Sequence, residues 1–138
     1  MAVGIVTLNP GAAVSPDGTA SNLAPQLARV KSSAGAPMPY FYQLNFDAAQ
    51  REQVSWQFVM PPNYLSAPIL RVQYKMTSAT SGAVAIDGRI AAVTPGDATD
   101  VDAKAFGSAN TTTDTVPGTA GYMKQISLRW RRSWYQPP

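Results

Sequence analysis

The chain has 138 residues, with 11 lysines and arginines, 8 acidic residues, a net charge of +3, and no cysteine or histidine. This length suits one domain with a core that needs no covalent cross-link. The missing residue types exclude disulfides, thiolate or histidine metal sites, and Ser-His-Asp or Cys-His catalysis. Charge is uneven, because the last fifteen residues hold four cations and no acid, whereas the remainder carries −1.

Residues 1–38 are rich in Ala, Gly, Pro, Ser and Val. They lack the basic start of a signal peptide, and no stretch of the chain is long and apolar enough to span a bilayer, so we expect a soluble protein made in a cytoplasm. A short strand is expected at residues 4–8 and one helical turn over residues 23–30. The leader reads either as disordered or as an ordered arm lying across a neighbouring subunit. Its scattered apolar residues favour the arm: Ile5, Val6, Leu8, Val14, Leu23, Leu27 and Val30.

Three consecutive strands are predicted between residues 40 and 76, each with large apolar side chains at every second position. The alternating sets are Tyr40, Tyr42, Leu44 and Phe46; Val54, Trp56, Phe58 and Met60; and Leu70, Val72, Tyr74 and Met76. Such alternation is typical of an antiparallel sheet with one buried face, so we expect Tyr40, Tyr42 and Trp56 in the core.

Further strands are expected at residues 83–93 and 122–130, with a hairpin loop at residues 77–82 before the first of them. Gly88 indicates a bulge or a close backbone approach. Residues 101–106 form a weak edge-strand candidate, and residues 110–115 are a Thr-rich run of the kind found on edges and loops. The last strand places Tyr122, Ile126, Leu128 and Trp130 on one face.

This organisation predicts an all-β protein, an antiparallel β-sandwich of jelly-roll or related type with an extended N-terminal arm. The expected parts are the arm at residues 1–38, the sandwich at 39–130 and a basic C-terminal tail at 131–138.

Three consecutive segments together resemble the β-sandwich structural proteins of tailed bacteriophages: residues 41–90, the acidic and Thr-rich stretch that follows, and residues 116–128. Two motifs within them are the most distinctive. They are WQFVMPPNY at residues 56–64, which ends an aromatic strand, and PGTAGYMKQISL at residues 117–128, with a hydrophobic strand and a Thr/Ser/Gly hairpin between them. The resemblance covers roughly residues 40–130. Proteins of this group commonly continue beyond the last of these strands, whereas this sequence has only a short basic tail after Trp130.

The resemblance implies a capsid decoration (cement) protein that binds the major capsid protein as a homotrimer on the virion surface, after synthesis in the cytoplasm of the host bacterium. The alternative is a receptor- or carbohydrate-binding module of a head fibre or tail fibre, with a glycan as ligand. Neither function is enzymatic, and neither involves a cofactor, a metal, nucleic acid or a membrane.

The acidic cluster Asp97, Asp100 and Asp102 could bind calcium. It lacks the glycine and the distal glutamate of an EF-hand loop, however, so we interpret it as a solvated loop. Paired carboxylates also catalyse glycoside hydrolysis, but three aspartates at this spacing are a very weak indicator of such an enzyme.

The C-terminal cluster of arginines and aromatic residues could bind single-stranded nucleic acid, but on a near-neutral body it is better explained as a protein-docking tail. Tyr64 follows a Pro-Pro-Asn turn and is expected to be exposed. The predicted partner-binding residues are Ile5, Val6, Leu8, Leu23, Leu27, Val30, Tyr64, Arg129, Arg131, Arg132, Trp134 and Tyr135.

Overall fold

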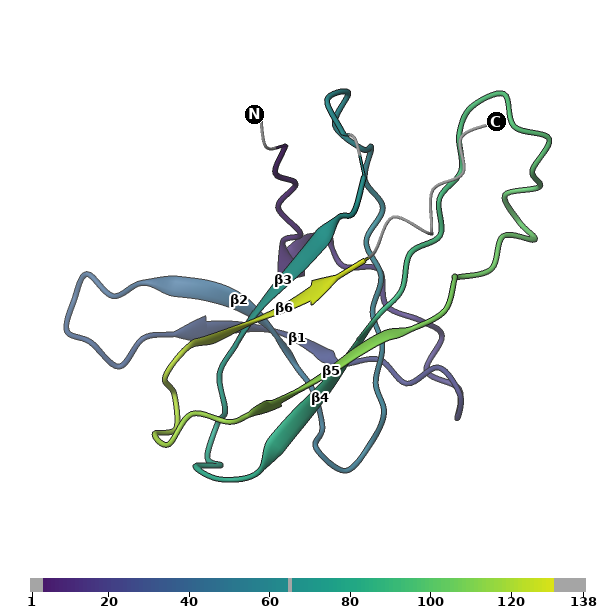
Figure 1. The fold of residues 1–138 in the computed structure, drawn as a ribbon. Coiled ribbons are helices and arrows are strands. Elements are labelled where there is room, and N and C mark those ends of the chain that lie inside the picture. The colour runs from purple at the N-terminus through teal and green to yellow at the C-terminus, as the bar shows by residue number, and fades with distance from the viewer. Residues whose placement is uncertain (1–3, 65, 131–138) are drawn as a thin grey trace. The chain divides into compact units, whose positions relative to one another are not determined.

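The computed structural model describes residues 4–64 and 66–130, and its regular structure is almost entirely β. The elements are a 3-10 turn η1 (Pro10–Ala12) and six strands, β1 (Gln26–Lys31), β2 (Tyr40–Asn45), β3 (Ile69–Tyr74), β4 (Ala83–Gly88), β5 (Asn110–Thr115) and β6 (Lys124–Arg129) (Figure 1). Every strand pair is antiparallel: β1 with β2, β3 with β6, and β4 with β5. The predicted all-β, antiparallel class is confirmed.

The chain divides into two compact units, residues 1–64 and residues 65–138. The first contains η1, β1 and β2, and the second contains the other four strands. The pairing of β1 with β2 joins residues on both sides of Met38, where the sequence had placed the end of the arm.

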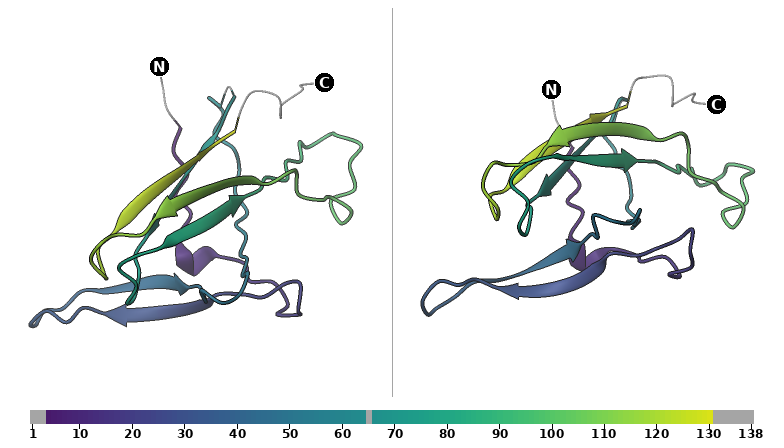
Figure 2. Two further views of the ribbon diagram at one scale, coloured as in Figure 1. Left: turned by 60° about the horizontal axis from the view of Figure 1, so that its bottom comes forward. Right: turned by 90° about the horizontal axis from the view of Figure 1, so that it is seen from below.

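In the second unit the inner faces of the two sheets meet. Side chains alternate between covered and exposed along β3, β4, β5 and β6. β5 and β6 also run side by side in every view (Figure 2), and the Asn110 side-chain amide donates a hydrogen bond to the Arg129 carbonyl (2.7 Å). The buried hydrophobic core among the described residues is Val116, Ile126, Leu128 and Trp130.

Gly88, at the end of β4, makes the close approach that the sequence indicated. A Cβ atom on it would lie 2.8 Å from Cη2 of Trp130 and 3.1 Å from Cδ2 of Leu128. Only a residue without a side chain lets β4 approach the Trp130 indole and the Leu128 methyl group so closely.

Several predicted elements are wrong. Residues 77–82 do not connect paired strands, because β3 pairs with β6 rather than with β4. Residues 101–106 and residues 4–8 form no strand, whereas the Thr-rich run at 110–115 does form one, β5. The helical turn expected over residues 23–30 is also wrong: most of that segment is β1, whose hydrogen-bond partner β2 overrides the helical spacing of three apolar residues.

The second predicted strand of the central three does not form a ladder. Residues 52–63 lie instead along the leader, with isolated bridges pairing Leu23 with Glu52 and Val14 with Ser55. The Trp56 indole N–H donates to the Asn9 carbonyl (2.9 Å). The leader is interrupted by prolines, which cannot donate to a ladder, so the apolar alternation of residues 54–60 finds no continuous partner.

The first unit also differs from the expected burial of β2. Tyr40 and Tyr42, predicted to be in the core, are 57% and 55% exposed. The neighbouring Gln43 is half-buried, and its Nε2 donates to Oδ1 of Asn45 (2.6 Å). The 3-10 turn η1 lies close to β2. Phe41, on the face of Gln43, is also exposed (42%), whereas Leu44, on the face of the tyrosines, is half-buried, so alternation along β2 did not show which side chains are covered.

Candidate functional site

The first candidate surface is an apolar strip made by the leader and the segment before the double proline. Gly4 approaches Pro61 so closely that a Cβ atom on it would lie 2.9 Å from the proline Cβ. Exposed apolar residues follow Gly4 and precede Pro61 directly in the sequence. The strip consists of Ile5, Val6, Phe58, Val59 and Met60, all exposed, with Val59 at 91% and Ile5 at 79%.

Among the described residues of the first unit, Pro25 is buried, but no aliphatic or aromatic side chain reaches the burial of the core in the second unit. The first unit instead exposes aliphatic and aromatic side chains on its strip and on β2. Exposed apolar side chains that gather on a surface often mark protein–protein or ligand contacts. The leader strip is therefore a candidate docking surface.

The second candidate surface is the outward face of the β1–β2 sheet. Cross-strand register places Leu27 beside Leu44, Arg29 beside Tyr42 and Lys31 beside Tyr40. The Arg29 guanidinium also lies over the Tyr40 ring, 5.6 Å from its centroid, a geometry that favours cation–π attraction. We name these six residues the aromatic–cationic face. It contains two cations and no acid.

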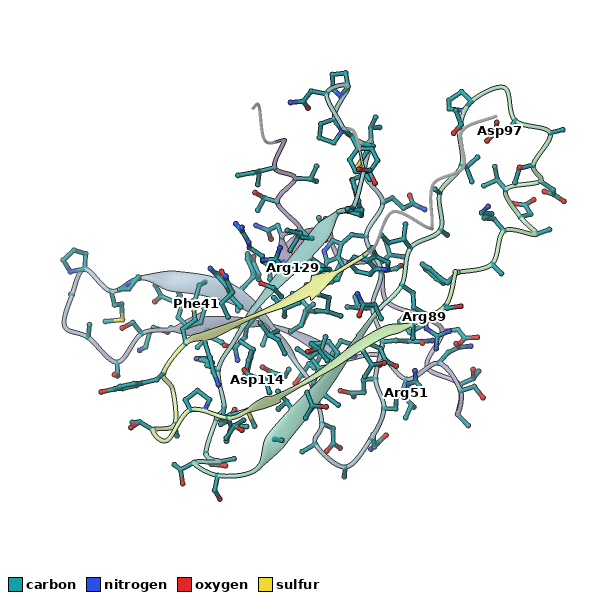
Figure 3. All side chains as sticks on the ribbon, in the orientation of Figure 1. Phe41, Arg51, Arg89, Asp97, Asp114 and Arg129 are labelled. Atoms are coloured by element: carbon teal, nitrogen blue, oxygen red, sulfur yellow. The ribbon has the colours of Figure 1, made fainter. Side chains whose placement is uncertain are left out.

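The second unit holds a polar cluster that ties three strands together. Asp114 of β5 accepts hydrogen bonds from the Tyr74 hydroxyl (2.8 Å) on β3 and from Nζ of Lys124 (2.8 Å) on β6. Lys124 also donates to the Thr115 carbonyl (2.6 Å). Figure 3 labels Asp114 among these strands.

The electrostatics of this cluster follow from its contacts. The Lys124 ammonium, followed by the Tyr74 hydroxyl, holds the pKa of Asp114 below its usual value. Burial, reinforced by the hydrogen bond to Asp114 and its negative charge, raises the pKa of Tyr74 to about 12. Near neutral pH the Tyr74 hydroxyl is therefore neutral and the Asp114 carboxylate is charged and hydrogen-bonded. The cluster stabilises the contact between strands and is not arranged for proton transfer.

The long connection between β4 and β5, residues 89–109, carries the acidic cluster. It is closed at its base by the Gly107 amide, which donates to the Ile90 carbonyl (3.0 Å). Asp97 accepts from the Thr94 amide, and Asp100 accepts from the Asp102 amide. Figure 3 shows Asp97 at the end of this loop that lies away from the strands.

No group of three or more acidic side chains within residues 4–64 and 66–130 is arranged to hold a metal ion. The carboxylates of Asp97 and Asp100 accept from amides of their own turns instead. Across the same residues, no helix has the length and apolar character needed to cross a membrane.

Within the first unit, the predicted partner-binding residues lie in different environments. Ile5 and Val6 lie on the exposed strip, Leu8 is half-buried, and Leu23 is half-buried at its bridge to Glu52. Leu27 and Val30 belong to opposite faces of β1, with Leu27 exposed and Val30 half-buried.

The remaining predicted residues lie towards the ends of the two units. The expectation that Tyr64 is exposed is wrong, because it is half-buried in a turn closed by its own amide and the Pro61 carbonyl (2.9 Å). Arg129 is exposed at the end of β6. Four of the predicted residues lie outside the described residues: Arg131, Arg132, Trp134 and Tyr135.

Sequence reasoning missed Arg29 and Lys31, although they alternate with Leu27 along β1. It also missed the contact of Asp114 with Tyr74 and Lys124. The sequence did contain a signal for this contact. Asp114 lies two residues before the buried Val116 and two after Thr112, so all three fall on the same face of the strand.

Comparison of the chain with protein families, with curated proteins and with solved structures found no match.

Proposed function

We propose that this chain is a virion structural protein that decorates and cements the capsid lattice of a tailed phage, binding the major capsid protein as a homotrimer on the capsid surface. The proposal starts from the resemblance of residues 40–130 to phage β-sandwich structural proteins. The all-β fold is compatible with it. In this role the protein is non-enzymatic and is made in the cytoplasm of the host bacterium.

The observation that carries the proposal is the leader strip. Its five apolar side chains are exposed, and the unit that bears them lacks a buried hydrophobic core among its described residues. A chain of this kind gains stability when a partner covers the strip, since each apolar side chain removed from water contributes favourable free energy. A lattice of capsid subunits offers such a partner, and cross-linking neighbouring capsomers makes that binding free energy available to the capsid.

The proposal assigns two elements to capsid contact. The leader strip supplies apolar area, and the basic tail with Arg129, Arg131 and Arg132 supplies charge for an acidic capsid surface. Trp134 and Tyr135 add the aromatic side chains that often dominate interface energetics.

The direct test is sedimentation of the purified protein with capsids assembled without it. We expect saturable binding at a fixed ratio to the major capsid protein. The double variant Ile5→Asp/Val59→Asp places two charges on the strip and should lose binding. Met123→Asp is the matched control, because Met123 is also exposed (70%) but belongs to the second unit. Full occupancy of capsids by the strip variant would contradict the proposal.

A second candidate function is carbohydrate or receptor binding on a head fibre or tail fibre. The exposure of Tyr40 and Tyr42 favours it, because aromatic rings on a sheet face can stack against sugar rings. A glycan array separates the two functions. Specific glycan binding that Tyr42→Ala abolishes, together with no binding to capsids, would support the fibre module.

A further inference from the structure

The aromatic–cationic face of β1 and β2 has an exposed surface that its own sheet leaves uncovered. Tyr40 and Tyr42 are more than half exposed, and Leu27 is 48% exposed. Arg29 and Lys31 are exposed beside them. Two-stranded sheets are marginally stable by themselves, so this sheet gains most from a partner that covers its outer face.

The chemistry of the face restricts that partner. Its six residues include two cations and no acid, and tyrosine and arginine are typical of interface hot spots. A suitable partner presents carboxylates beside apolar side chains. Two copies of the face itself are not complementary, because they would place cations against cations.

The same chain carries a segment of the complementary kind. Residues 97–102 of the loop between β4 and β5 hold three exposed carboxylates and no cation. Val101 (66%) and Phe106 (57%) are exposed within the same loop. One exposed lysine, Lys104, lies between them, so residues 97–106 together carry three carboxylates and one cation. Loops of this length without secondary structure in a compact protein are commonly binding loops.

We infer that the acidic loop of one copy, residues 97–102 with Val101 and Phe106, docks on the aromatic–cationic face of a neighbouring copy. Such a contact joins two different surfaces, so it is head-to-tail, and it closes into a ring when the rotation between copies allows. The inference rests on the proposed homotrimer, and it names the contact that holds the trimer together. The leader strip remains available for the capsid.

The test is the molar mass of the full chain by light scattering over a range of protein concentrations. Arg29→Glu reverses a charge on the face, and Asp102→Lys reverses one on the loop while keeping the carboxylates of Asp97 and Asp100. Each variant should weaken association by roughly tenfold or more, because like charges then meet across the contact. The chain with both substitutions should recover most of the lost affinity.

Arg71→Glu is the matched control, since Arg71 is an exposed arginine on a strand of the second unit. It should leave the mass unchanged. Raising the salt concentration should weaken association of the wild-type chain, because exposed charge pairs are screened. Circular dichroism of each variant establishes that the strands are retained.

Three results would overturn the inference. If the wild-type chain is a trimer and neither charge reversal changes its mass, the proposed contact is wrong but the proposed trimer is supported. A wild-type monomer at all concentrations would remove docking between copies in solution, while capsid sedimentation would still test the proposed function. A loss of capsid binding in Arg29→Glu with unchanged mass would assign the face to the capsid protein instead.

Discussion

Trp130 lies directly against Gly88, and the contact leaves no room for a side chain on the glycine. A Cβ atom there would lie 2.8 Å from Cη2 and 3.0 Å from Cζ2 of the indole. Since Trp130 is 7% exposed, the ring cannot move into solvent without losing its burial. The two residues therefore fix how closely β4 approaches the end of β6.

We expect Gly88→Ala to lower the free energy of unfolding by about 1–3 kcal/mol through overpacking. Urea denaturation followed by tryptophan fluorescence measures it. Gly118→Ala is the control, because nothing lies within 4 Å of a Cβ built on Gly118, and its effect should be small. If the contact is responsible, adding Trp130→Phe should make the Gly88→Ala change less costly than it is alone. Equal costs in both backgrounds would refute the steric explanation.

Leu128 is the most deeply buried side chain in the described core, with 1% exposure. Leu128→Ala should destabilise the protein by about 2–5 kcal/mol, because it removes apolar contacts and leaves a cavity. Thermal and urea unfolding measure the change. Ile69→Ala, on β3 at 41% exposure, should cost much less. Similar losses for the two variants would mean that the second unit does not depend on this core.

The strands of the second unit show when sequence alternation suffices. β3 and β6 each have one covered face, so the apolar phases of Leu70, Val72, Ile126 and Leu128 predicted their inner sides correctly. Pairing was not predictable in the same way, because it depends on contacts between distant segments. β3 skips its sequence neighbour β4 and pairs with β6, which no local pattern encodes.

The first unit shows the opposite limit. Tyr40, Tyr42 and Leu44 share one face of β2 as predicted, yet both tyrosines are exposed, and so is Phe41 on the opposite face. A two-stranded sheet can cover either face, so alternation alone does not select the core. The candidate surfaces were visible only in part. Ile5 and Val6 could be proposed from composition, but the contact of Gly4 with Pro61, which joins the leader to the segment before the double proline, could not.

The Asp114 cluster predicts acid sensitivity. Hydrogen bonds from Lys124 and Tyr74 hold the pKa of Asp114 below its unfolded-state value. Its contribution to stability is therefore present above the unfolded-state pKa, about 4, and is lost as pH falls through the lower folded-state pKa. Urea midpoints should decrease over this acidic range, and the decrease should be smaller in Asp114→Asn. Lys124→Met removes the cation of the cluster, so it should also make the decrease of the urea midpoint with pH smaller. Asp17→Asn changes a carboxyl outside the cluster and does not test this assignment. An unchanged slope in both cluster variants would contradict the assignment.

Tyr74 predicts the opposite behaviour in alkali. Burial first, and then the hydrogen bond and charge of Asp114, raise the pKa of Tyr74 to about 12. Its contribution to stability is present below the unfolded-state pKa, about 10, and is lost as pH rises towards the folded value. Tyrosinate absorbance should show a late-titrating step that Tyr74→Phe removes. Tyr122→Phe, which alters an exposed tyrosine, should retain that step. A late step that persists in Tyr74→Phe would place it on another tyrosine.

The leader gives the last prediction, because its described contacts lie within its own unit. The Trp56 indole N–H donates to the Asn9 carbonyl, and the Val14 amide donates to the Ser55 carbonyl (2.8 Å). Trp56→Phe keeps an aromatic ring but removes one donor, at a cost of about 0.5–1.5 kcal/mol to leader attachment. Limited proteolysis should therefore cut residues 10–20 faster in this variant.

Phe58→Leu is the control for that experiment, because Phe58 lies in the same segment, is 47% exposed, and its side chain donates no hydrogen bond. Its cleavage rate should match that of the wild-type chain. Deleting residues 1–30 would take most of β1 from β2, so loss of capsid binding by that truncation would not isolate the leader. Equal cleavage of Trp56→Phe and wild type would mean that the Asn9 contact does not hold the leader in place.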